Sequence, residues 1–214
     1  MTDAPAFETI YADAHLLVLN KPSGLLSVPG KGQAKQDCLT TRVQLIYPDA
    51  LVVHRLDMGT SGLMLMARGA AMQTALAKLF EARNIHKRYE AVVNGPLQAS
   101  ADWALIDLPI ALDWPRRPLR IVHPQGKSSQ TCWRLLQYDA LADTSRLELN
   151  PMTGRSHQLR VHLKALGHPI VGDALYAPDA IAAKASRLLL HATQLFFTHP
   201  ATGQAVVFEN KAPF

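Results

Sequence analysis

Segments that read as β-strands follow one another directly in the second half of this chain, and this succession restricts the fold more than any other feature. A strand-like pattern at residues 131–138 is followed at once by another at 146–149, and the chain ends with runs at 188–197 and 205–209. A doubly wound parallel sheet would need a helix between most strands. The pattern therefore predicts an α+β fold with a mixed, mostly antiparallel sheet and flanking helices.

The first half of the chain adds more strands and most of the helical segments. Apolar residues spaced along one helical face predict helices, and short apolar runs bounded by Gly, Pro or polar residues predict strands. Helices are expected at residues 37–47, 70–83 and 156–166, and further strands at 7–11, 15–20, 51–54, 62–67 and 89–93. No repeat or flexible linker interrupts them, and a chain of this length suits one large domain or two small ones.

Cysteine content and hydropathy exclude several classes of protein. The 214 residues contain two cysteines, Cys38 and Cys132, which excludes a disulfide framework and a four-cysteine zinc site. No apolar run approaches the ~20 residues of a membrane span, and the N-terminal segment lacks the features of a secretory signal. These observations favour a cytoplasmic protein that does not enter a membrane.

The positive charge of the chain is concentrated rather than evenly distributed. Lys and Arg number 22 against 17 Asp and Glu, and no acidic residue occurs at 114–138 or at 149–172. Such stretches indicate basic surface facing an anion, with chance scatter as the alternative. The excess is compatible with a nucleic-acid partner.

Motifs for nucleotides, metals and serine hydrolysis fail on inspection. Gly126–Ser128 resembles the end of a P-loop, but a strand-like segment follows where a helix is required. Gly59–Gly62 resembles a nucleophile elbow, but Leu63 replaces the required glycine. The chain has no H-E-x-x-H motif and no Cys/His cluster. We therefore expect neither a metal nor a cofactor.

Three segments carry candidate chemistry. In HRLDMGTSGL, Asp57 follows a predicted strand and is flanked by Gly and hydroxyl residues, which suits a catalytic carboxylate; a cap on a turn or on the next helix is the alternative. In KRYEAVVNG, Tyr89 either belongs to the core or stacks on a base. In GRSHQLRVHL, Arg155 lies at a helix start, and Arg160 lies deeper, where a cation needs an anionic partner; Asp57 is a candidate.

Together these segments resemble the RluA-type family of RNA pseudouridine synthases. NKPSGLLSVPG, GDALY, LLLHA and FTHPATG match the family as well and occur in its order, so the resemblance spans residues 20–203. Ala177 departs from the glycine that often follows the GDxxY tyrosine. The resemblance implies the pseudouridine synthase fold with a central RNA-binding cleft. It also implies that residues 1–214 form a single catalytic domain without the family's N-terminal S4-like RNA-binding domain.

The resemblance also implies a reaction and a set of residues. Specific uridines in large-subunit rRNA, in the tRNA anticodon stem-loop or in both would be flipped out and isomerised to pseudouridine without a cofactor. Asp57 matches the catalytic carboxylate, which either adds covalently or removes a ribose proton. Arg160 matches the arginine that pairs with this aspartate, and Tyr89 matches the aromatic residue that packs against the target base. Arg55 matches the residue that fills the space left in the RNA by the flipped nucleotide. Phosphate contacts are expected from Arg116, Arg117, Lys127 and Arg155.

Three other functions are alternatives to an RNA pseudouridine synthase. A non-catalytic RNA-binding module would make Asp57 dispensable, and a glycoside hydrolase would need a second carboxylate that the three segments lack. A cofactor-dependent transferase would need a nucleotide-binding loop. His54, His157 and His191 are expected to be structural, and the protein is expected to act as a monomer with RNA as its partner.

Overall fold

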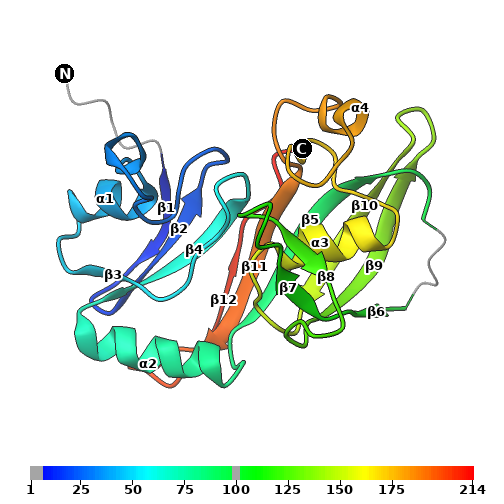
Figure 1. The fold of residues 1–214 in the computed structure, drawn as a ribbon. Helices are drawn as coiled ribbons and strands as arrows, with labels where there is room; N and C mark the ends of the chain where they lie inside the picture. Colours follow the sequence, from blue (N-terminus) through cyan, green and yellow to red (C-terminus); the bar gives the residue numbers. More distant parts are fainter. Residues whose placement is uncertain (1–6, 98–101) are drawn as a thin grey trace. The chain divides into compact units, whose positions relative to one another are not determined.

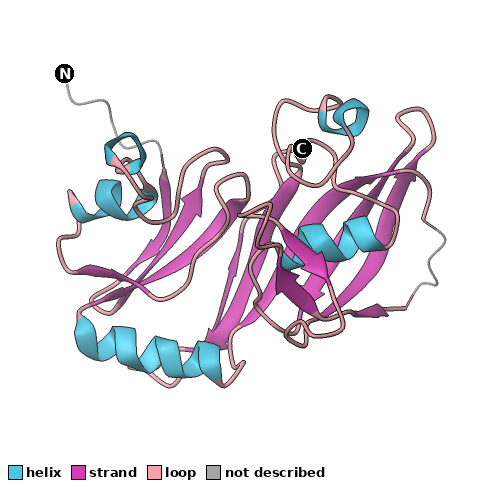
Figure 2. Ribbon diagram, in the orientation of Figure 1, coloured by secondary structure: helices cyan, strands magenta, loops and turns pink. Residues whose placement is uncertain are grey.

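The chain divides into two compact units, and buried apolar strands form the core of the first. The computed structural model describes residues 7–97 and 102–214. Unit 1 consists of Met1–Lys87 and His191–Pro213, and unit 2 consists of Arg88–Leu190 with Phe214. Figure 2 shows that strands dominate both units. Each unit is described separately below.

The sheet of unit 1 is built on two strands that are almost entirely buried. Its order is β1-β2-β4-β11, with β3 pairing to β4 and β12 to β11 (Figure 1). All pairs are antiparallel except β4 with β11. The strands are β1 (Glu8–Ala12), β2 (Leu16–Lys21), β3 (Ala50–Val52), β4 (Ser61–Arg68), β11 (Leu190–Thr198) and β12 (Ala205–Glu209).

In its described residues, unit 1 contains two α-helices, and a side-chain cap fixes the start of the first. α2 (Ala70–Glu81) buries Met72 and Leu76 and contacts β4. α1 (Leu39–Gln44) begins at Cys38, whose sulfur accepts the N–H of Thr41 while the Thr41 hydroxyl accepts the N–H of Cys38. A 3₁₀ turn, η1 (Gln33–Lys35), precedes it. Cys38 thus acts as a helix cap, a role that the sequence analysis did not assign.

Unit 2 is an antiparallel sheet with one main helix. The strand order is β5-β10-β9-β6, and α3 supplies the buried side chains of Leu159, Val161 and Leu163. β7 and β8 form a separate two-stranded hairpin. The elements are β5 (His86–Asn94), β6 (Ala104–Asp107), β7 (Ile110–Leu112), β8 (Arg120–Val122), β9 (Gln130–Asp139), β10 (Thr144–Pro151), α3 (Gln158–Ala165) and α4 (Asp179–Ala182).

The α+β class with a mixed, mostly antiparallel sheet is confirmed. Each strand and helix expected from the sequence has a counterpart, and the strand expected at residues 205–209 matches β12. β9 begins directly after Gly126–Ser128, which confirms that this segment is not a P-loop. The short elements β6, β7, β8 and α4 were not predicted. No helix in the described part of the chain is long and apolar enough to cross a membrane.

Candidate active site

Asp57 lies in the loop that joins β3 to β4, at the exit of a strand as predicted. Its side chain is partly buried, whereas its neighbours Arg55 and Met58 are exposed and Leu56 is buried. The Asp57 carbonyl accepts the N–H of Thr60, which closes the turn before β4. Because a strand follows rather than a helix, the alternative that Asp57 caps the next helix is wrong.

The Asp57 loop is held mainly through its backbone carbonyls. The hydroxyl of Ser27 donates to the carbonyl of Leu56 (2.7 Å) and accepts the Leu56 N–H, while the hydroxyl of Ser23 donates to the carbonyl of Gly59 (2.6 Å). These donors come from the NKPSGLLSVPG segment. Its function in this structure is therefore to fix the loop on both sides of Asp57.

Lys21 is the most deeply buried part of this support. Its side chain is 0% exposed, and its ammonium group donates to the carbonyls of Pro22 (2.8 Å), Leu25 (2.7 Å) and Met58 (3.1 Å). A buried cation of this kind is tolerated because several dipoles replace its water. Lys21 links the end of β2 to the loop that carries Asp57.

Substituting Lys21→Met is expected to destabilise the protein by about 1–3 kcal/mol, because carbonyls that accept from the ammonium group lose a donor in a buried place. The measurement is the free energy of unfolding in urea. Lys31→Met, at an exposed lysine further along the same segment, is the control and should stay within about 0.5 kcal/mol of wild type. Equal stabilities of the two variants would contradict this role for Lys21.

The start of β4 is fixed against β11 by a buried polar chain. His191 Nε2 lies 2.7 Å from the side-chain oxygen of Asn210, and its Nδ1 lies 2.7 Å from the Ser61 hydroxyl. Gly62 has φ +105, and a Cβ there would lie 2.3 Å from the carbonyl oxygen of Ala192. These contacts explain the Ser and Gly that follow Asp57 in the motif.

His54 is a structural residue in the same loop. Its Nε2 accepts the N–H of Leu65 at 2.8 Å, and its ring lies against Phe80 with centroids 4.7 Å apart. Burial, with a smaller contribution from the charge of Lys87, lowers the pKa of His54 to about 3. Burial also lowers the pKa of the Lys87 ammonium group. His54 therefore stays neutral at physiological pH.

Arg160, in unit 2, has the anionic partner that its position requires. It is 6% exposed, and its Nε and Nη2 donate to the two carboxylate oxygens of Asp173 at 2.8 and 2.6 Å. Asp173, 1% exposed, also accepts the N–H groups of Leu175 and Tyr176. The sequence analysis matched GDALY to the family but missed this pairing. The predicted pairing of Arg160 with Asp57 stays a prediction.

Tyr176 packs beside this ion pair. The guanidinium carbon of Arg160 lies 4.9 Å from the centroid of the Tyr176 ring. The Tyr176 hydroxyl accepts the N–H of Arg120 at 2.9 Å and lies 2.6 Å from Nδ1 of His157. His157 has φ 57 and immediately precedes α3. Arg160 is thus oriented by a carboxylate on one side and an aromatic ring on another.

The first residue of α3, Gln158, belongs to a buried polar network. Gln158 is buried; its amide oxygen accepts from Thr153 and its amide nitrogen donates to Thr131. The Thr131 hydroxyl lies 2.9 Å from Nδ1 of His162, whose Nε2 lies 3.0 Å from the carbonyl of Leu108. Burial lowers the pKa of His162. This network attaches α3 to the sheet of unit 2.

The remaining predicted residues divide into one buried aromatic ring and a set of exposed cations. Tyr89 in β5 is 9% exposed and lies opposite Leu149 of β10. The cations expected to contact RNA are all exposed: Arg55, Arg116, Arg117, Lys127 and Arg155. Their roles stay predictions.

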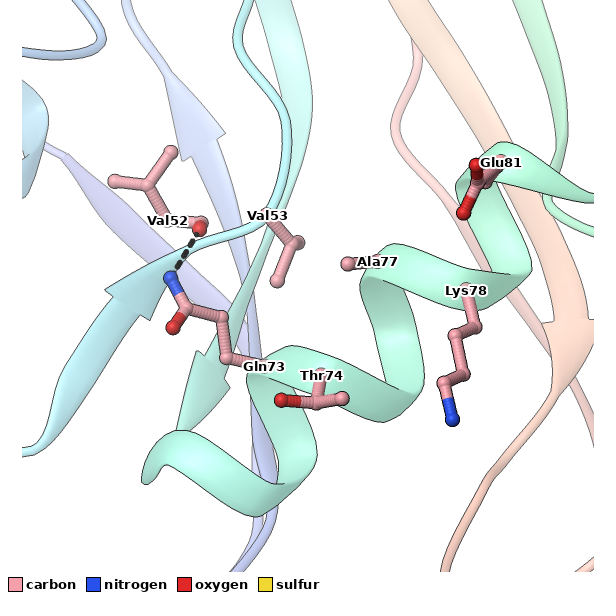
Figure 3. Close-up of a pocket in the computed structure, with 7 residues that line it drawn as sticks. All are labelled: Val52, Val53, Gln73, Thr74, Ala77, Lys78 and Glu81. Atoms are coloured by element: carbon pink, nitrogen blue, oxygen red, sulfur yellow. Dashed lines mark hydrogen bonds between the residues drawn. The ribbon is translucent and has the colours of Figure 1, made fainter.

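An open pocket elsewhere in unit 1 contains none of these residues. It lies between α2 and the end of β3, where Gln73 donates to the carbonyl of Val52 at 2.9 Å (Figure 3). Its lining residues are Val52, Val53, Gln73, Thr74, Ala77, Lys78 and Glu81. The pocket lacks the chemistry of the three motif segments, so we assign it no part in catalysis.

Comparison with known proteins identifies the family of this chain. The family model described as RNA pseudouridylate synthase matches residues 15–165, which include Asp57, Tyr89 and Arg160. The chain belongs to this family. It is accordingly an RNA pseudouridine synthase, an isomerase.

Individual relatives cover nearly the whole enzyme. The Dual-specificity RNA pseudouridine synthase RluA of Escherichia coli (strain K12) is 47% identical over 211 residues, covering 98% of this chain and 95% of the relative. The protein of the same name from Yersinia pestis is 48% identical over 206 residues, covering 96% and 98%. The structure of human RNA Pseudouridylate Synthase Domain Containing 1 matches with a TM-score of 0.83 and 28% identity, covering 100% of this chain and 86% of that one.

Proposed function

We propose that this synthase isomerises specific uridines of structured RNA, in large-subunit rRNA, in the tRNA anticodon stem-loop or in both, with Asp57 as its catalytic carboxylate. The assignment of Asp57 rests on the hydrogen bonds that fix its loop. Backbone carbonyls on both sides of Asp57 accept hydrogen bonds from Lys21, Ser23 and Ser27. Such support keeps a reacting group in a defined position. The relatives named for dual specificity favour more than one RNA substrate.

The chemistry requires a carboxylate and a base that can turn within the site. The bond between N1 of uracil and C1′ of the ribose breaks, the uracil rotates while bound, and its C5 forms a bond to the same C1′. C5 then loses its proton to solvent and N1 gains one, so the composition of the nucleotide is unchanged. Asp57 either adds covalently or removes a ribose proton, and both roles need its ionised form. We propose that Arg160, oriented by Asp173 and Tyr176, and Tyr89 contact the substrate in the same reaction.

A uridine within a stem or folded loop must leave its stack to be modified. Arg55 is exposed two residues before Asp57, and we propose that its side chain fills the space that the flipped nucleotide leaves. Arg116, Arg117, Lys127 and Arg155 are exposed as well and would contact phosphates, a contribution that weakens with salt and does not read sequence. We further propose that the enzyme acts as a monomer in the cytoplasm, where its two free cysteines stay reduced.

The test of the activity uses transcripts labelled with tritium at C5 of uracil. We expect release of tritium from a large-subunit rRNA fragment or a tRNA anticodon stem-loop, with pseudouridine as the product and the RNA chain intact. Transcripts in which one uridine at a time is replaced by cytidine identify the target. Release of free uracil instead would identify a hydrolase and would contradict the proposed reaction.

A further inference from the structure

The tip of the β7–β8 hairpin presents a tryptophan to solvent. Trp114 is 65% exposed, whereas Trp133 is 7% exposed and Trp103 contacts the guanidinium groups of both Arg88 and Arg134. A single exposed aromatic residue is not by itself a site. What distinguishes Trp114 is the way the surrounding tip is built.

A set of hydrogen bonds fixes the tip. The buried carboxylate of Asp113 accepts from the backbone N–H (3.3 Å) and the Nε (2.7 Å) of Arg116, and the N–H of Asp113 donates to the carbonyl of Leu119. Nε of Arg117 donates to the carbonyl of Trp114 at 3.1 Å, and its guanidinium carbon lies 4.7 Å from the centroid of the indole ring. The ring therefore has a cation against it while most of its surface remains open to solvent.

The hairpin stem is anchored to the same scaffold as Arg160. Ile110 is buried against Val161 and Tyr176. The N–H of Arg120 donates to the Tyr176 hydroxyl, and a Cβ at Gly126 would lie 2.6 Å from the backbone of Ile110. Within unit 2, the hairpin whose tip carries Trp114 is thus attached to the elements that hold the Asp173–Arg160 pair. Figure 1 shows β8 beside α3.

The positive charge beside Trp114 indicates the chemical class of ligand that would bind to its ring. Arg116 and Arg117 lie in the tip with Trp114 and are exposed, the Arg116 side chain to 71%. Lys127 is exposed as well, but its backbone pairs with Ile110 at the other end of β7. The acidic residue of the tip, Asp113, has a side chain only 6% exposed and is paired with Arg116. From Trp114 to Tyr138 the sequence contains no acid. An open indole ring among cations is the arrangement with which proteins bind single-stranded nucleic acid, by base stacking and phosphate contacts together.

We propose that Trp114, held by Arg117, is a stacking platform for an unpaired base of the substrate RNA, and that Arg116 and Arg117 contact the phosphates beside that base. The proposal rests on the RNA substrate proposed above and adds a residue that selects for single-stranded segments. Stacking recognises the face of a base, so this contact favours loops over duplexes without reading a particular base.

The experiment measures binding and catalysis in one series of variants. The probe is a synthetic RNA hairpin with a uridine-containing loop, and a fully paired duplex of the same length serves as the comparison. Titration with the hairpin should quench the tryptophan fluorescence of the wild type, and Trp114→Phe should remove most of that quenching while retaining most of the affinity. Trp114→Ala should raise the Kd and KM about 5- to 100-fold, as expected for one lost base stack, with kcat at saturating RNA unchanged.

Two further variants separate stacking from charge and from general surface change. Arg117→Lys keeps the charge, so the salt dependence of binding should stay the same while the Kd rises, because a lysine lacks the planar group that stacks on the indole. Leu141→Ala changes a fully exposed apolar residue between Asp139 and Asp143 in the same unit and should leave the Kd unchanged.

Wild-type quenching by the hairpin, its loss in Trp114→Phe and weaker binding by Trp114→Ala would support the platform. Equal Kd and KM for Trp114→Ala and wild type, or quenching that persists in Trp114→Phe, would overturn it even if tritium release is normal. Absence of tritium release from every transcript would instead count against the proposed function, because the quenching measurement does not depend on turnover.

Discussion

Substituting Asp57→Asn is expected to abolish tritium release from labelled RNA while RNA binding is retained. The amide has nearly the same size as the carboxylate, but it neither accepts a proton nor adds to an electrophilic carbon. Loss of a positioned general base alone costs about 10²–10⁴-fold in rate, and loss of a nucleophile costs at least as much. The measurement is single-turnover tritium release at saturating RNA, with the Kd determined in parallel by filter binding.

The control for this substitution is Asp37→Asn, which makes the same chemical change at a carboxylate whose side chain is 64% exposed and pairs with Arg42. It should turn over RNA at the wild-type rate. The thermal unfolding midpoint of both variants shows whether a lost rate reflects lost folding. Turnover by Asp57→Asn within a few fold of wild type would contradict the assignment of Asp57.

The second large effect is on stability. Substituting Asp173→Asn should destabilise the protein by about 3–5 kcal/mol, the cost of leaving one member of a buried ion pair without the other. The asparagine keeps one acceptor but places an NH₂ group towards the guanidinium of Arg160, whose side chain is 7% exposed. The measurement is the free energy of unfolding in guanidinium chloride.

The double variant Asp173→Asn/Arg160→Met tests whether the loss comes from the buried guanidinium that Asp173 no longer neutralises. Because the double variant has no buried guanidinium, it should be clearly more stable than the sum of the two single losses predicts. The exposed pair Asp37–Arg42 serves as the comparison, since breaking it should cost at most about 1 kcal/mol. Strict additivity of the Asp173 and Arg160 substitutions would contradict a coupled pair.

The sequence predicted the parts of the fold in which local pattern and tertiary environment agree. β2 and β4 are continuous apolar runs because both of their faces are buried, and α2 has an apolar face that packs on β4. In the second half, the direct succession of β9 and β10 is enough to predict antiparallel pairing. For the site, the sequence predicted that Asp57 follows a strand, and the structure places it in the loop between β3 and β4.

The elements and contacts that the sequence missed depend on distant parts of the chain. β7 and β8 are only 3 residues each, too short for an apolar period to appear, and they are held through Ile110 and the Tyr176 hydroxyl. The burial of Arg160 called for an anion, but the identity of that anion follows from the turn that carries Asp173. Likewise, nothing local to Lys21 distinguishes a buried ammonium group from a solvated one.

The attachment of the Asp57 loop has a consequence for how this enzyme can diversify. Lys21, Ser23 and Ser27 hold the loop through main-chain carbonyls, which every amino acid provides. The exposed side chains of Arg55 and Met58 can therefore be exchanged without removing these bonds. Under the proposed role of Asp57, a substitution at Met58 alters the surface beside the carboxylate while the bonds that fix its loop are preserved, so a change of substrate need not begin with a loss of catalysis.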